Sequence, residues 1–97
     1  MSITALLDLR LKPDSVDDGY RVIHETLAAT RAFAGCVSVD VLIDTTDPAH
    51  VMVLEVWESL AADAAYREWR AGPGVSNLGS VLAGAPILTR YETSPSL

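Results

Sequence analysis

The chain has 97 residues, enough for one domain, and its hydrophobic content of 49% against 21% charged residues argues against disorder. A net charge of −6 without a Lys/Arg cluster argues against nucleic-acid binding, because phosphate backbones repel an acidic surface. No apolar run approaches the roughly 18 residues of a membrane span. We therefore expect a single folded domain over residues 1–97, with neither a nucleic-acid nor a membrane partner.

Two features of the sequence bear on the cellular compartment. The N-terminus lacks a basic segment followed by a long apolar stretch, so it does not resemble a secretory signal, and we expect a cytoplasmic location. Cys36 is the only cysteine, which excludes an intramolecular disulfide and a cysteine-rich metal cluster. Its simplest interpretation is a small buried residue that opens a strand.

The first 35 residues predict a strand followed by a long helix. Residues 3–11 alternate between hydrophobic and polar positions, as in a half-buried strand. Pro13-Asp14-Ser15 then ends the strand and offers a helix N-cap, and Gly35 is expected to stop the helix. The inward-facing helical residues, spaced by three or four, are Val16, Tyr20, Ile23, Leu27, Thr30 and Ala34.

Residues 36–58 predict a hairpin. The segment 36–44 alternates with Val37, Val39, Val41 and Ile43 on one face. A turn at 45–48 leads into a third strand at 50–58. This third strand is apolar on both faces, so both faces of the sheet need cover.

The C-terminal 40 residues predict a second helix, a short helical stretch and a last strand. Ser59 offers an N-cap for a helix over about 60–70. On a helical wheel Ala61, Ala65 and Trp69 share the side that we expect to face the sheet, with Tyr66 at its edge. The opposite side carries Asp63, Arg67 and Arg70. A short helical stretch near 75–82, a strand at 87–92 and a loose tail at 93–97 follow.

The order β-α-β-β-α-β is the split pattern of ferredoxin-like domains, an α+β fold with a four-stranded antiparallel sheet. In this fold the helices cover only one face of the sheet. The third strand presents Met52, Leu54 and Val56 to the other face, which water alone would solvate poorly. A second copy is the simplest cover for so short a chain, so we expect a homodimer with sheet packed against sheet.

Most familiar catalytic motifs are absent from the sequence. It has no Gly-rich phosphate loop and no Gly-x-Ser-x-Gly elbow. The only histidines, His24 and His50, do not have metal-binding spacing. We therefore expect no dedicated metal site, no dinucleotide-binding loop and no hydrolase triad.

A pocket between the sheet and the helices is the remaining candidate site. Trp57, Tyr66 and Trp69 lie near small alanines of the second helix, so the two layers either close up tightly or leave an apolar cavity. Such a cavity would suit a flat aromatic ligand, which stacks on aromatic side chains.

Several polar residues have two possible interpretations. His24 and Arg31 flank the apolar stripe of the first helix. They are either ordinary surface residues, or Arg31 holds a phenolate or carboxylate while His24 moves a proton. Asp63 either interacts with the helix dipole or contacts substrate. Glu55 shares the strand face of Trp57, where a carboxylate needs a partner, unless a bulge shifts the phase.

Three runs in the sequence resemble the antibiotic biosynthesis monooxygenase (ABM) domain of the dimeric α/β-barrel superfamily. They are Thr30-Arg31-Ala32-Phe33-Ala34-Gly35-Cys36, the Asp47-Pro48 hairpin and Glu55-Val56-Trp57-Glu58-Ser59. The resemblance covers nearly the whole chain. It implies a dimeric α/β barrel and oxidation of a phenolic, quinol or polycyclic aromatic substrate by O₂ without metal, flavin or haem.

The resemblance transfers only part of the family's site. Trp57 matches the family's tryptophan. In polyketide-oxidising members an Asn precedes this tryptophan by four positions and a Tyr follows it by six, where this chain has Val53 and Asp63. Quinol-oxidising members have a His nine positions after it, where this chain has Tyr66, which donates a hydrogen bond but is a poor base. The Asn and His of the haem-degrading members are also missing.

We therefore expect a cofactor-independent, homodimeric monooxygenase that acts on a small aromatic substrate with O₂. The alternatives are a ligand-binding or accessory dimer without chemistry, and a cyclase or isomerase on the same scaffold. The catalytic candidates are Trp57, Tyr66 and His24, and the substrate-binding candidates are Arg31, Trp69, Glu55, Asp63 and Tyr20.

Overall fold

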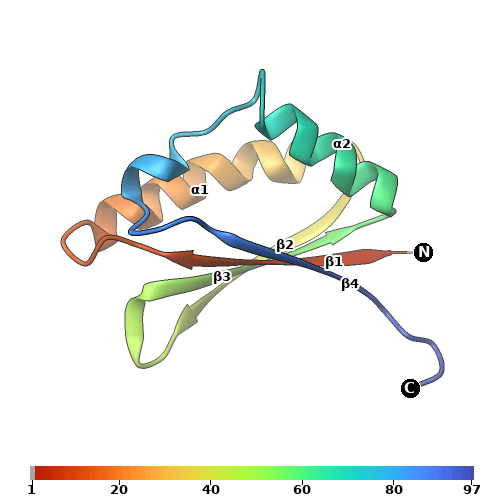
Figure 1. The fold of residues 1–97 in the computed structure, drawn as a ribbon, viewed down its shortest axis with the longest axis horizontal. Helices are drawn as coiled ribbons and strands as arrows, with labels where there is room; N and C mark the ends of the chain where they lie inside the picture. Colours follow the sequence, from red (N-terminus) through yellow and green to blue (C-terminus); the bar gives the residue numbers. More distant parts are fainter. Residues whose placement is uncertain (1) are drawn as a thin grey trace.

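The computed structural model describes residues 2–97 as one four-stranded antiparallel sheet with all helices on one side (Figure 1). The elements are β1 (Ile3–Arg10), α1 (Val16–Ala32), β2 (Cys36–Asp44), β3 (Asp47–Trp57), α2 (Leu60–Arg70), the 3-10 helix η1 (Leu78–Val81) and β4 (Ile87–Glu92). The strand order is β2-β3-β1-β4. The predicted ferredoxin-like β-α-β-β-α-β fold is thus confirmed.

The turn from α1 into β2 depends on Gly35. The helix ends at Ala32, so the prediction of Ala34 as an inward helical residue is wrong; Ala34 lies beyond the helix and is exposed. Gly35 has a φ of 89°, which residues with a side chain rarely adopt, and a Cβ there would lie 2.5 Å from the Cβ of Ala62. Its carbonyl accepts a 2.9 Å hydrogen bond from the Glu58 backbone N–H. The turn is therefore fixed against the entrance to α2.

A bulge at the start of β2 interrupts the alternation of inward and outward residues that was predicted for this strand. The pairing with β3 shifts between Cys36 and Ser38, which places Val37 between the two ladder positions. Val37 is 62% exposed, whereas Val39, opposite Glu55, is buried. The prediction that Val37 and Val39 share one face is therefore wrong, because the alternation restarts after the bulge.

The core lies between the sheet and the helices in two clusters. One packs α1 against the sheet through residues such as Leu9, Leu27 and Val51. The other joins Trp57 and Tyr66 to the start of β1. Both clusters lie on the helical side of the sheet, so hydrophobic burial fixes which strand residues face the helices.

The opposite face of the sheet is bare of helices (Figure 1). Leu6, Met52 and Leu54 are half-buried there, and Leu42, Ile87 and Tyr91 are at least half exposed. None of the helices within residues 2–97 is long and apolar enough to cross a membrane.

Candidate functional site

The helix α2 presents a polar stripe to the sheet. Its start follows the prediction, because the Ser59 hydroxyl accepts a 3.1 Å hydrogen bond from the Ala62 N–H. The orientation of the helix differs from the prediction. Asp63 and Tyr66 are buried, while Ala61 and Ala65 are exposed, so the prediction that the alanine side faces the sheet is wrong.

The polar side of α2 faces the sheet because it forms ion pairs with β3 and β4. Arg67 donates to Glu55 at 2.7 Å and to Asp63 at 3.2 Å, and Arg90 pairs with the other Asp63 oxygen. Two carboxylates and two guanidinium groups thus neutralise one another, which makes their burial tolerable. Glu55 faces the helices and has a partner there, as its phase predicted.

Trp57 lies beneath this network rather than in a cavity. Its side chain is fully buried, and its indole N–H donates to Glu55 at 3.0 Å. Its ring centroid lies 4.8 Å from that of Tyr66, and the Phe33 centroid lies 5.3 Å from that of Tyr66 and 5.4 Å from that of Trp69. The aromatic residues therefore pack tightly together, and of these four only Tyr66 reaches the neighbouring cavity.

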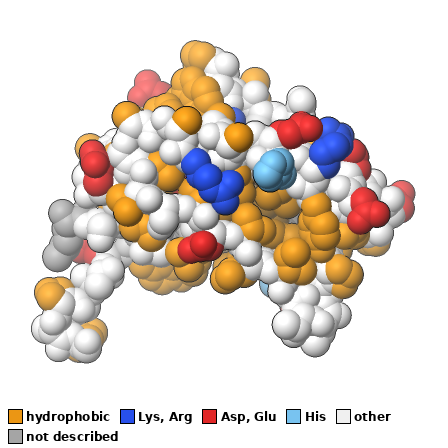
Figure 2. Space-filling view, turned by 180° about the vertical axis from the view of Figure 1, so that it is seen from behind, with side chains coloured by type: hydrophobic (Ala, Val, Ile, Leu, Met, Phe, Trp, Pro, Cys, Tyr) orange, Lys and Arg blue, Asp and Glu red, His pale blue; other side chains and the backbone are white. Residues whose placement is uncertain are grey.

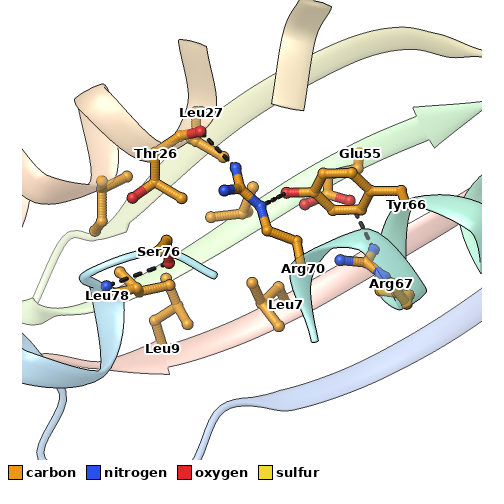
Figure 3. Close-up of a pocket in the computed structure, with 12 residues that line it drawn as sticks. Leu7, Leu9, Thr26, Leu27, Glu55, Tyr66, Arg67, Arg70, Ser76 and Leu78 are labelled. Atoms are coloured by element: carbon orange, nitrogen blue, oxygen red, sulfur yellow. Dashed lines mark hydrogen bonds and ion pairs between the residues drawn. The ribbon is translucent and has the colours of Figure 1, made fainter. Parts of the chain in front are cut away.

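A cavity of about 160 Å³ lies between the sheet, α1, α2 and the segment that leads to η1 (Figure 3). Its apolar lining consists of Leu7, Leu9, Ile23, Leu27, Val53 and Leu78. Its polar lining consists of Thr26, Glu55, Tyr66, Arg67, Arg70 and Ser76. Of the two alternatives, the layers pack tightly at Trp57 and Trp69, and the cavity lies beside Tyr66, walled by aliphatic side chains and arginines rather than by indoles.

Arg70 is the most constrained polar residue of this cavity. Its guanidinium donates to the Tyr66 hydroxyl at 2.7 Å, to Thr26 O at 2.7 Å, to Thr30 Oγ1 at 3.0 Å and to Gly74 O at 3.0 Å. Tyr66 and Thr30 also share a 2.6 Å hydrogen bond. These four bonds join α2, α1 and the loop after α2. Figure 3 shows two of them, from the guanidinium to Tyr66 and to Thr26.

All of these Arg70 partners are neutral. Within residues 2–97, no carboxylate lies within 4.0 Å of its guanidinium, whereas Arg67 beside it has two. The cavity wall therefore carries one uncompensated positive charge. A guanidinium has five N–H donors, so four hydrogen bonds leave one for a ligand.

The predicted site residues separate into three groups. Glu55 and Tyr66 line the cavity. Tyr20, His24 and Arg31 line a different hollow, between α1 and β2, so the structure does not bring His24 to Tyr66. Trp57, Trp69 and Asp63 line neither hollow.

The prediction missed Arg67 and Arg70, which it placed on the outer side of α2. One signal was present in the sequence. Asp63, Tyr66, Arg67 and Arg70 are spaced by three, one and three, which places them on one side of a helix, and Glu55 required a cationic partner. Among residues 2–97, no group of three or more His, Cys, Asp or Glu side chains is placed to hold a metal ion.

Comparisons with known proteins agree on the fold. The family model described as antibiotic biosynthesis monooxygenase matches residues 2–78. A crystal structure of an antibiotic biosynthesis monooxygenase is similar over 96% of this chain and 99% of its own, with a TM-score of 0.81 and 20% identity. A conserved protein from Methanosarcina mazei has a TM-score of 0.81 and 18% identity over 97% of this chain and 94% of its own. A Mycobacterium tuberculosis protein has a TM-score of 0.78 and 18% identity over 97% of this chain and 96% of its own. No curated protein matches the sequence.

Proposed function

The chain belongs to the antibiotic biosynthesis monooxygenase family, and from this premise we propose that its cavity binds a phenolic or quinol substrate as an anion that O₂ then oxidises. The observation that carries the proposal is the Arg70 guanidinium, which faces an apolar cavity without a carboxylate partner. A positive charge in such a place favours a phenolate over a neutral phenol.

Arg70 is suited to stabilise that anion. A hydrogen bond from a charged donor contributes roughly 1.5–3 kcal/mol, which corresponds to a decrease of about one to two in the pKa of the bound phenol. The Tyr66 and Thr30 hydroxyls hold the guanidinium in place before the substrate arrives. Preorganised charge of this kind stabilises an anion without reorganisation during the reaction.

The proposed reaction takes its electrons from the substrate. The bound anion transfers one electron to O₂, and the resulting superoxide and substrate radical combine to form a peroxide at a ring carbon. Cleavage of the O–O bond leaves one oxygen on that carbon as a carbonyl, and the other leaves as water with the two hydrogens of the substrate. The protein binds, orients and stabilises the anion, and water at the cavity mouth accepts the first proton.

The size of the cavity favours a single-ring substrate. Its volume of about 160 Å³ is close to that of an engineered cavity of about 150 Å³ that holds benzene. A hydroquinone therefore fits inside, whereas a polycyclic substrate would extend through the mouth. Among the substrates that the family resemblance implies, a single-ring quinol is the best match.

Oxygen uptake with 1,4-hydroquinone and with an anthrone tests the proposal. We expect uptake above the protein-free rate, larger for hydroquinone, with quinone absorbance rising in step. Arg70→Met should lower kcat/KM about 10- to 100-fold, because it removes a charged hydrogen bond. Arg21→Met is the matched control, since Arg21 pairs with carboxylates on the exposed side of α1 and should leave the rate unchanged.

A ligand-binding protein without chemistry is the second candidate. One observation favours it: Glu55, the carboxylate in the cavity, accepts hydrogen bonds from both Arg67 and Trp57, so it is not a free base. The same feature counts against a cyclase or isomerase, which needs a base. Hydroquinone binding without oxygen uptake would select the binding protein, and product without oxygen use would select the isomerase.

We also propose that two copies pack through the bare face of the sheet. Met52, Leu54 and Val56 lie at the centre of this face, between β1 and β2. Light scattering at low micromolar concentration should give the mass of a dimer for the wild type and of a monomer for Leu54→Arg. Val75→Arg, in the exposed loop after α2, is the control and should remain dimeric.

A further inference from the structure

The arginines of this chain divide into two kinds. Within residues 2–97, carboxylates pair with Arg10, Arg21, Arg67 and Arg90. Arg31 and Arg70 have no carboxylate within 4.0 Å, and each lines an apolar hollow. The chain has a net charge of −6, so a guanidinium group that lines a hollow without a carboxylate partner indicates a site for an anionic ligand.

The hollow at Arg31 is a groove of about 260 Å³ between α1 and the edge strand β2. Its floor is formed by Ile23 and Leu27 of α1, and its far wall by Val41 and Ile43 of β2, which are 38% and 49% exposed. Figure 2 shows hydrophobic side chains gathered on this side of the molecule, bordered by a histidine and by Lys or Arg side chains. The groove thus offers apolar walls beneath a polar rim.

Hydrogen bonds to the sheet fix both ends of the groove. At one end Arg31 donates to the carbonyl of Val39 in β2 at 3.1 Å, and at the other Tyr20 donates to the carbonyl of Pro48 in β3. The Val39 contact uses one of the five N–H donors of Arg31. The remaining donors are available to a ligand that lies along the groove.

From this geometry we infer that the groove is a second binding site, separate from the cavity, for an aliphatic carboxylate of medium chain length. The carboxylate pairs with Arg31, and the chain lies over Ile23, Val41 and Ile43 towards Tyr20. Arg31 and Tyr20 are eleven residues apart on α1, which places their backbones about 16 Å apart along the helix axis. That length suits an extended chain better than a compact ring.

The character of the walls sets the choice of ligand. The groove is lined by branched aliphatic side chains, and its one aromatic residue, Tyr20, lies at an end. A flat aromatic ligand would therefore find no ring to stack on along most of its length. His24 lies on the rim between Tyr20 and Arg31.

Titration calorimetry with octanoate tests the site, combined with amide chemical-shift mapping of the full chain. We expect one octanoate per chain, with shifts concentrated at Arg31, Val41 and Ile43, which line the groove and not the cavity. Arg31→Met should weaken binding about tenfold or more through loss of a charged hydrogen bond. Arg21→Met, which is also exposed on the same helix, should leave the affinity unchanged. 1-Octanol, which has the chain without the charge, should bind at least tenfold more weakly than octanoate.

Four results would overturn the inference. They are undetectable octanoate binding, equal affinity in Arg31→Met and the wild type, shifts confined to cavity residues such as Leu7 and Val53, or tighter binding of 2-naphthoate than of octanoate. The rate of hydroquinone oxidation by the Arg31→Met variant should equal that of the wild type. This measurement keeps the test of the groove independent of the function proposed for the cavity.

Discussion

The cavity and the groove both contain an arginine without a carboxylate, yet the two arginines are held very differently. Arg70 donates four hydrogen bonds to partners on three segments, whereas Arg31 donates one, to a single strand. A cation fixed in advance loses little freedom when a ligand binds, so it can favour one ligand geometry strongly. The cavity is therefore suited to chemistry, and the groove to looser binding.

The largest expected effect concerns the buried ion pairs that support the cavity. Asp63 is fully buried between Arg67 and Arg90, whose side chains are 21% and 42% exposed. Asp63→Asn should lower the free energy of unfolding by about 2–4 kcal/mol, because two guanidinium groups lose their shared anion and water screens that loss only in part. Urea denaturation monitored by tryptophan fluorescence measures the change.

Asp18→Asn is the matched control for this variant. Asp18 is also in the first turn of a helix and pairs with an arginine, but both side chains are more than half exposed. Its substitution should cost less than about 1 kcal/mol. Equal losses in the two variants would mean that burial does not strengthen the Asp63 pairs.

The same substitution in the two hollows compares their packing directly. Val53 of the cavity is 1% exposed, and Val41 of the groove is 38% exposed. Val53→Thr buries a hydroxyl and should cost about 1–3 kcal/mol, whereas Val41→Thr should change stability by less than about 0.5 kcal/mol. If thermal unfolding gave similar losses for both, the groove would be part of the closed core rather than a surface hollow.

A third comparison isolates the hydrogen bonds that hold Arg70. Thr30→Val removes the hydroxyl that contacts both Tyr66 and Arg70, and should cost about 1–2 kcal/mol and reduce hydroquinone turnover. Thr26→Val keeps the backbone carbonyl that accepts from Arg70, so its stability should remain within about 0.5 kcal/mol of the wild type. A Thr30→Val enzyme with normal turnover would show that Arg70 needs no such support.

The contrast also explains what the sequence could and could not predict. Periodicity places residues on one helix or strand reliably, so it identified His24 and Arg31 as neighbours beside the apolar stripe of α1, and they do share the groove. The cavity is assembled from β1, β3, α1, α2 and the segment through η1. Periodicity within one element does not report how those elements meet.

The error on α2 has the same origin. Hydrophobicity alone directs Ala61 and Ala65 inwards, but alanine gains little from burial because its side chain is small. Asp63 and Arg67 lie inwards because residues of β3 and β4 neutralise them. Glu55, 12 residues before Arg67, pairs with Arg67, and Arg90, 27 residues after Asp63, pairs with Asp63. The bulge at the start of β2 is likewise a property of the strand pair, since the pairing shifts there.

The smallest expected effect lies outside both hollows, on the bare face of the sheet. There His50 bridges two carboxylates: its Nδ1 lies 2.9 Å from Asp44 and its Nε2 lies 2.9 Å from Asp8. The hydrogen bond with Asp44 is the main cause that raises the pKa of His50; burial and Arg10 oppose it, and Asp8 adds to it. The same contact, with those from Thr46, lowers the pKa of Asp44.

The direction of the resulting pH dependence follows from the raised pKa. A folded-state pKa above the ordinary value near 6.5 means that the imidazolium stabilises the fold fully below about pH 6.5, and that this contribution is lost as the pH rises through the raised pKa. The free energy of unfolding, measured in urea from pH 6 upwards at fixed protein concentration, should therefore fall more in the wild type than in His50→Gln.

His24→Gln is the control that relates this cluster to the groove. His24 is exposed on α1, so its substitution should leave the difference between wild type and His50→Gln unchanged. A wild-type pH dependence that persisted in full in His50→Gln would show that the bridge from His50 to Asp8 and Asp44 is not its source.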